Sequence, residues 1–255
     1  MKRFSAILLA AGLILCASAG GGDPATPTPL GAQATTPAPA ITSNEGKEAT
    51  PMAESAAMIP LPPVKTTGAM PLEDSLARRR SAREFSALPI TLEEAGQLLW
   101  AAQGVTDPQR GYRTAPSAGA LFPLEVYLVA GKVEGLPAGV YTYDPRRHGL
   151  KCVATGDKRA DLCRVALDQD PVRKAAVDIV IAAVVARTEA KYGSRAERYV
   201  HMEVGHAGQN VLLQAVARGL GAVPIGAFDD KDVKRVLGLP PSEDPFYIIP
   251  IGPVR

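Results

Sequence analysis

The spacing of apolar positions predicts several helices in the second part of the chain. The clearest covers residues 91–103, where leucine and alanine recur every three or four positions. Thr91 and Glu94 occupy the two positions of a capping box, the signature of a helix start. A longer helix is predicted over residues 195–219, with a glycine at its end. Shorter helical patterns cover residues 72–80, 160–167 and 231–237.

Strands are predicted where apolar residues follow one another without a helical period. Residues 177–186 are almost wholly aliphatic and predict a central strand, and residues 124–133 predict a strand that is buried on both sides. Two short apolar runs, 140–143 and 150–154, flank a turn sequence and predict a hairpin. Further strands are predicted over residues 222–226 and 246–251. This mixture of helices and strands with an antiparallel hairpin predicts the α+β class.

The first residues carry the pattern of an export signal. Lys2 and Arg3 precede an apolar run that is too short to span a bilayer, and Ala17-Ser18-Ala19 offers the small residues that signal peptidase accepts. We therefore expect residues 1–19 to be a signal peptide and the mature protein to lie in the periplasm or cell envelope. A second interpretation places a lipid anchor on Cys16, because residues 13–16 resemble a bacterial lipobox.

Residues 20–70 have the composition of a linker. Ten of the 23 prolines of the chain precede residue 72, and residues 20–70 contain no aromatic residue. Such a segment buries too little apolar area to offset the entropy lost on ordering. We therefore expect an extended linker over residues 20–70 and one folded domain over residues 71–255.

Composition excludes several classes of protein. A net charge of +2, from 28 basic and 26 acidic residues, argues against binding to nucleic-acid phosphates. Three cysteines give neither a disulfide scaffold nor a CxxC metal site, and His201 and His206 do not have the HExxH spacing of a zinc hydrolase, so no metal is expected. Cys152 and Cys163 remain after removal of a signal, either as a disulfide or as two buried thiols.

Three segments of the folded part have residue types that suit ligand binding. Residues 78–85 hold four arginines and a serine, which can surround a phosphate, although a solvated helix end is the alternative. Residues 116–123 are small and precede a buried strand, so their backbone can approach a flat ligand, or they form only a tight turn. Residues 219–228 are rich in glycine and again offer bare backbone N–H groups.

A fourth cluster lies on the long predicted helix. Glu203, His206 and Asn210 are three and four residues apart and therefore share one face, with Gln209 beside them. Polar residues on an otherwise apolar helix indicate a lined cavity or a subunit contact. The alternative is a hydrogen-bonded histidine in the core.

In order along the chain, these motifs resemble the FMN-dependent nitroreductase family. They are RRSxRxF at 79–85, PSxG at 116–119 and GLGxxPIGxF at 219–228. The longer form PSAGALFPLE and the motif GHxxQN at 205–210 resemble the SagB-type branch of that family, which includes azoline dehydrogenases of thiazole- and oxazole-modified peptides. The resemblance covers residues 72–255.

The resemblance implies a nitroreductase-like α+β fold, with a mixed or antiparallel central sheet flanked by helices, and a homodimer. It also implies which residues bind FMN. The FMN phosphate and ribityl chain are assigned to Arg79, Arg80 and Ser81, and the pyrimidine edge of the flavin to Arg83. The loop that the other subunit lays against the ring corresponds to Pro116, Ser117, Ala118, Gly119 and Ala120. The strand end that faces the ring and its N5 corresponds to Pro224, Ile225 and Gly226, and a late basic residue near the phosphate to Arg255.

The family's chemistry is centred on the flavin, so no catalytic side chain is expected. We expect an FMN-dependent oxidoreductase that passes electrons through flavin N5 to a small-molecule acceptor in a ping-pong cycle, with NAD(P)H as the donor. Two alternatives are a SagB-type dehydrogenase that oxidises azoline rings in a peptide substrate, and a flavin or small-molecule binding protein without turnover. Export would separate the enzyme from cytoplasmic NAD(P)H and would require another donor.

Overall fold

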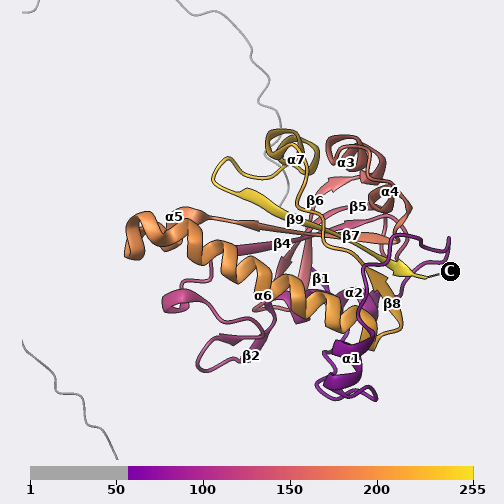
Figure 1. Cartoon of the computed structure of the whole chain (residues 1–255), viewed down its shortest axis with the longest axis horizontal. Helices are drawn as coiled ribbons and strands as arrows, with labels where there is room; N and C mark the ends of the chain where they lie inside the picture. Colours follow the sequence, from indigo (N-terminus) through magenta and orange to yellow (C-terminus); the bar gives the residue numbers. More distant parts are fainter. Residues whose placement is uncertain (1–56, 255) are drawn as a thin grey trace, which may run out of the picture. The chain divides into compact units, whose positions relative to one another are not determined.

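A seven-stranded sheet forms the centre of the folded domain (Figure 1). The computed structural model describes residues 57–254. The strand order is β1-β6-β5-β4-β7-β9-β8, and neighbouring strands pair antiparallel throughout. The predicted α+β class, with an antiparallel sheet flanked by helices, is therefore confirmed.

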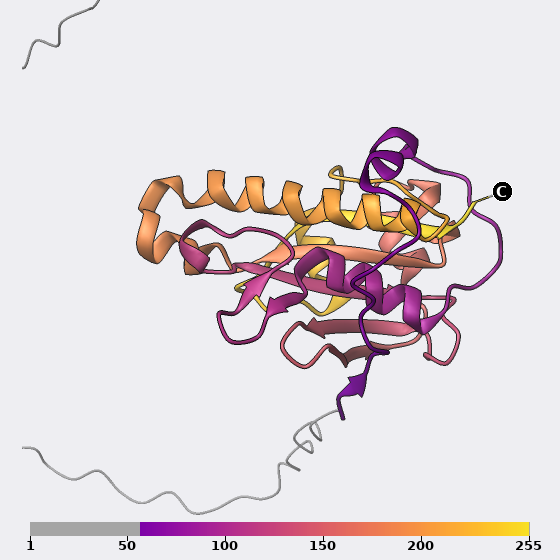
Figure 2. The same ribbon diagram turned by 90° about the horizontal axis from the view of Figure 1, so that it is seen from below.

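The central strands are buried on both faces because each face is covered by helices. They are β4 (Leu124–Ala130), β7 (Val177–Ala183) and β9 (Asp244–Pro253). In β7, Ile179 packs in the core beneath α2 (Leu92–Gln103) and α6 (Ala196–Ala217), whereas its neighbour Val180 packs in a second core beneath the shorter helices. Those helices are α3 (Arg159–Val165), α4 (Asp170–Lys174) and α7 (Asp230–Leu237). Figure 2 shows the long helix α6 running along the sheet.

Several predicted elements are confirmed with small changes at their ends. The hairpin consists of β5 (Gly139–Asp144) and β6 (Gly149–Thr155). Gly219, at a φ of +72°, follows the end of α6 as predicted. The first helix, α1 (Leu72–Arg78), ends two residues early.

Three strand predictions are wrong at their C-terminal ends. The strand predicted over residues 124–133 ends at Ala130. The strand predicted over residues 222–226 is β8 (Leu220–Ala222), which ends before Pro224, a residue without an N–H for the ladder. The strand predicted over residues 177–186 ends at Ala183 and is followed by a helix that was not predicted, α5 (Val185–Tyr192). A small separate hairpin, β2 (Val105–Asp107) and β3 (Tyr112–Arg113), was also not predicted.

The folded domain begins earlier than the sequence indicated. The expected signal over residues 1–19 and most of the expected linker lie outside the described residues, but β1 (Ile59–Pro60) pairs with β6. We call residues 58–67 the N-terminal strap. Leu61 of the strap is buried, and Pro60 is tolerated because β1 is an edge strand.

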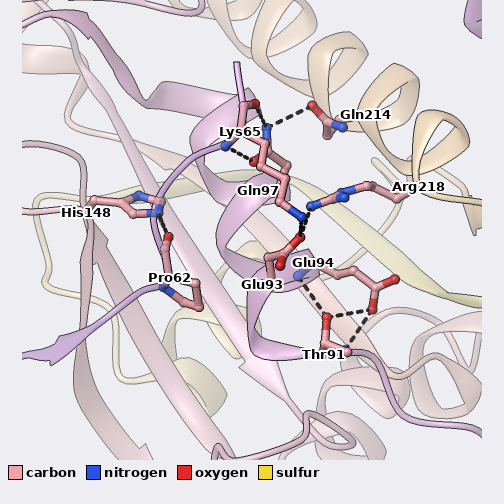
Figure 3. A network of polar contacts seen from close by, with 9 residues as sticks. All are labelled: Pro62, Lys65, Thr91, Glu93, Glu94, Gln97, His148, Gln214 and Arg218. Carbon is pink, nitrogen blue, oxygen red and sulfur yellow. Dashed lines mark hydrogen bonds and ion pairs between the residues drawn. The ribbon is translucent and has the colours of Figure 1, made fainter. Parts of the chain in front are cut away.

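Polar contacts fix the strap to the domain (Figure 3). The Lys65 N–H donates to Gln97 Oε1 at 3.0 Å, and Gln97 Nε2 donates back to the Lys65 carbonyl at 2.9 Å. His148 Nε2 hydrogen-bonds the Pro62 carbonyl at 3.0 Å. The linker expectation is therefore wrong for the strap, residues 58–67, because apolar anchors and paired backbone groups offset the cost of ordering it.

The two cysteines of the folded domain are free thiols. Cys163 is buried in the second core, whereas Cys152 packs against the core on the other face of the sheet. The disulfide alternative is therefore wrong. Among residues 57–254, no helix has the length and apolar character needed to cross a membrane.

Candidate functional site

The arginine segment, residues 79–83, lies against the edge of the sheet. Ser81 forms a parallel bridge with Ala222 of β8, and the Ala82 N–H donates to the Ala222 carbonyl at 3.0 Å. The close approach of the arginine segment to β8 requires glycine at 221, because a Cβ there would lie 2.6 Å from Ala82 Cβ. Two of the three predicted binding segments are therefore adjacent in one protomer.

The arginine segment carries positive charge that acidic side chains do not neutralise. Arg78 pairs with Asp74 at 3.4 Å, but within the described residues no carboxylate pairs with Arg79, Arg80 or Arg83. One guanidinium nitrogen of Arg80 donates to the carbonyls of Ala77 and Arg79, at 2.9 and 2.8 Å. Guanidinium groups without acidic partners, next to the Ser81 hydroxyl, form a site for an anion with several oxygens.

The chain that leaves β8 offers a free backbone donor four residues after the strand ends. Ile225 exchanges two backbone hydrogen bonds with Ile248, at 2.8 and 3.0 Å. The next N–H, that of Gly226, has no acceptor in the part of the chain that the structure describes. Gly226 is exposed, and a Cβ there would meet only Tyr247, at 3.6 Å. Pro224–Gly226 therefore presents an accessible N–H to a ligand.

The third predicted segment, the 116–120 loop, lies at the other end of α6. The Ala118 N–H donates to Glu203, in the first half of this helix, at 2.8 Å, whereas α1 lies beside Leu213 and Ala217. At 1.5 Å per residue, the two points on α6 are about 20 Å apart. Figure 1 shows α1 near one end of α6 and α5 near the other. One protomer therefore does not bring the loop to the arginine segment.

The polar cluster on α6 divides between two environments. Glu203 is 4% exposed and Asn210 donates to the Thr114 carbonyl at 3.2 Å, so both residues fix the chain around the 116–120 loop. Burial raises the pKa of Glu203, whereas the Ala118 N–H and the Ser117 hydroxyl lower it. His206 and Gln209 are exposed on the outer face of the helix. The core-histidine alternative is therefore wrong for His206.

The structure adds two residues to the surroundings of the loop. Lys191 and Tyr192 end α5 beside Gly119: a Cβ on this glycine would lie 2.8 Å from Tyr192 Oη and 2.9 Å from Lys191 Nζ. No sequence pattern predicts them, because the apolar run of β7 continues into the start of α5.

An open pocket of about 610 Å³ adjoins Gly226. Its walls include His201 and Phe246, whose rings meet edge to face with centroids 5.3 Å apart. Across residues 57–254, no three His, Cys, Asp or Glu side chains are grouped so that they could bind a metal ion. Arg255, the last predicted contact of the phosphate, lies outside the described residues.

Comparison with known proteins identifies relatives along most of the folded domain. A Methanocaldococcus jannaschii protein named as a nitroreductase is 45% identical over 181 residues, which cover 71% of this chain and 90% of that protein. A crystal structure from Ralstonia eutropha, also named as a nitroreductase, has a TM-score of 0.67 at 30% identity and covers 80% of this chain and 92% of that one.

A more distant relative is the microcin B17-processing protein McbC of Escherichia coli. It is 31% identical over 156 residues, which cover 59% of this chain and 57% of that protein, so the chain spans little more than half of its length. Residues 76–253 match the model of the nitroreductase family. Because this match spans well over half of the chain, the protein belongs to the nitroreductase family.

Proposed function

We propose that this nitroreductase-family protein is an FMN-dependent oxidoreductase that acts on a small-molecule acceptor. The observation that carries the proposal is the bridge between Ser81 and Ala222, which sets unpaired arginines against the end of β8, four residues before the free N–H of Gly226. This arrangement suits a ligand that has a phosphate at one end and a flat ring with hydrogen-bond acceptors at the other.

The described residues fit FMN at the phosphate end. Arg79 and Arg83 would bind the phosphate oxygens with the Ser81 hydroxyl, and the free N–H of Gly226 would face the ring. A bound flavin would accept and pass on a hydride, a reaction for which side chains alone have no group. The arginines supply positive charge without competing carboxylates, so FMN would displace no internal ion pair.

A homodimer would complete this site. The 116–120 loop lies about 20 Å from the arginine segment along α6. The resemblance to the family implies that the loop of a second copy covers the ring. The outer face of α6 supports such an interface: Met202 is 48% exposed, and a Cβ on Gly205 would meet no atom within 4 Å. Tyr192 Oη and Lys191 Nζ would then lie beside the covered ring, where both can donate a hydrogen bond to a substrate.

A second candidate function is the oxidation of azoline rings in a peptide. The motifs at 116–125 and 205–210 and the similarity to McbC favour it. Reconstituted protein, reduced by dithionite or NADPH, is mixed with a nitroaromatic compound, and oxidised protein is mixed with an azoline peptide. Reduction of the nitroaromatic supports the first function, and azole formation supports the second. Flavin-loaded protein that reacts with neither substrate and that no donor reduces would be a carrier, which contradicts both.

We further propose that the protein is exported, on the sequence pattern of residues 1–19. The donor would then be an envelope molecule rather than NAD(P)H. Intact mass of protein from the envelope fraction tests this: a chain that begins at Gly20 supports cleavage by signal peptidase, and a diacylglycerol adduct on Cys16 supports an anchor. A chain that begins at Met1 contradicts export and favours NAD(P)H.

A further inference from the structure

We propose that Glu203 is a positioning residue, which fixes the 116–120 loop in the conformation that covers the flavin of a second copy. This inference rests on the function proposed above. Glu203 acts through Ala118 and Ser117 and does not itself contact the cofactor.

The loop has a conformation that its sequence alone disfavours. Gly119, Ala120 and Phe122 all have positive φ, at +61°, +56° and +47°. Glycine adopts such angles freely, but alanine and phenylalanine do so at a cost. Contacts from outside the loop must therefore stabilise this backbone.

Two arginines stabilise the chain just after the loop, at Phe122. The Arg113 guanidinium lies over the Phe122 ring at 4.3 Å, and Arg187 donates to the Phe122 carbonyl at 3.2 Å. Within the loop, the Phe122 N–H donates to Ser117 Oγ at 2.9 Å. These contacts do not hydrogen-bond the turn at 118–120, which α5 contacts through Lys191 and Tyr192.

Glu203 supplies a hydrogen bond to this turn. Its Oε1 accepts the Ala118 N–H at 2.8 Å, and among the described residues it is the side chain outside the loop that hydrogen-bonds this turn. The carboxyl is almost fully buried on α6, so the contact is shielded from competing water. Arg113 and His206 are the charged or titratable groups that attract the carboxylate.

The position of Glu203 links the loop to the proposed interface. Glu203 and the exposed Gly205 and His206 lie within one turn of α6. A loop fixed to this turn moves with the helix face that would meet the second copy. The loop of one protomer would thereby keep a constant position over the other protomer's flavin.

Variants at both ends of the Glu203–Ala118 contact test the proposal. Glu203→Met removes the acceptor with little change in volume, and Glu203→Gln keeps an acceptor oxygen. Ala118→Pro removes only the N–H, and it suits the backbone because Ser117 has the extended ψ of 137° that a following proline prefers. Glu134→Leu, at an exposed turn distant from the loop, is the matched control.

Hydrogen–deuterium exchange of the peptide covering 114–123 measures directly how well the loop backbone is protected, and FMN titration measures the affinity of the site. For Glu203→Met we expect at least tenfold faster exchange and at least tenfold weaker FMN binding, whereas Glu203→Gln and Glu134→Leu stay within threefold of wild type. Ala118→Pro should weaken FMN binding as much as Glu203→Met does. If thermal melts show that Glu203→Met does not fold, the FMN affinity of Ala118→Pro tests the proposal in its place.

Three results would overturn the proposal: unchanged exchange in Glu203→Met, faster exchange with unchanged FMN affinity and flavin spectrum, or an equal loss in Glu203→Gln. Wild-type protein that binds no FMN would contradict the proposed function. The exchange data would still decide, separately, whether Glu203 fixes the loop.

Discussion

Ser81 and Ala222 form a parallel bridge between the segment that follows α1 and the edge strand β8. This bridge brings together two motifs from opposite ends of the folded domain, and it sets the arginine segment beside the end of β8, from which the chain continues to Pro224–Gly226. The proposed cofactor site depends on the charge of these arginines.

Arg79→Ala should weaken FMN binding by about 1.5–3 kcal/mol, the range for a hydrogen bond to a charged group. Arg78→Ala is the matched control, because Arg78 is already paired with Asp74 and should contribute much less. Fluorescence titration of FMN with each variant measures the difference. Equal affinities for the Arg79 and Arg78 variants would show that the phosphate does not bind at this segment.

Gly205→Arg should break the proposed dimer without unfolding the protomer. Gly205 lies on the open face of α6, and arginine is a better helix former than glycine by about 1 kcal/mol. We expect light scattering to show a wild-type dimer and a monomeric variant that has lost FMN. A wild-type monomer that retains FMN would contradict the site shared between two copies.

Ala120→Trp should abolish turnover and leave the fold intact. Ala120 is exposed on the loop, and an indole would fill the space of the ring at a cost of about 1–3 kcal/mol. Ala120→Gly is the control, because it removes the strain at a φ of +56° and adds no volume. Flavin content and single-turnover reduction are compared beside a thermal melt. If Ala120→Trp keeps the flavin content and the reduction rate of wild type, the loop does not lie at the flavin ring.

The stability of the protein should depend on pH because of Asp178. It is fully buried in β7, and neither carboxylate oxygen has a hydrogen-bond partner within residues 57–254. Burial raises the pKa of Asp178 well above the usual 3.8, although the nearby Arg159 opposes the shift. The folded protein therefore keeps this proton where the unfolded chain has lost it.

Because the folded state binds more protons, stability should fall as pH rises from about 4 towards the folded pKa, by up to about 1.4 kcal/mol per pH unit. Asp178→Asn removes this loss, so we expect the variant to melt at a higher temperature than wild type at pH 8 and to differ little at pH 4. Melting curves across this range check the sign. A variant that is equally destabilised at every pH would contradict a protonated Asp178.

Local features of the fold could be predicted from the sequence, and distant pairings could not. The capping box of α2 was predictable because its partners are three residues apart, and the structure has both hydrogen bonds, at 3.1 and 2.8 Å. The strand β1 was missed because it pairs with β6 far along the chain, and its proline-rich sequence indicated a linker.

The same limit applies to the site. The arginine and glycine motifs were found because their residue types are distinctive wherever they lie. The contact between Glu203 and Ala118 joins positions 85 residues apart, and no local pattern reports it. The sequence placed Glu203 on the correct helix, but only the fold shows that it faces the loop while His206 faces outward.

The visible absorption spectrum of the purified protein tests the central claim most directly. We expect the two flavin bands at about one FMN per protomer, bleached by dithionite and lost together when Arg79 is replaced by alanine. Colourless wild-type protein that takes up no FMN on reconstitution would contradict the account.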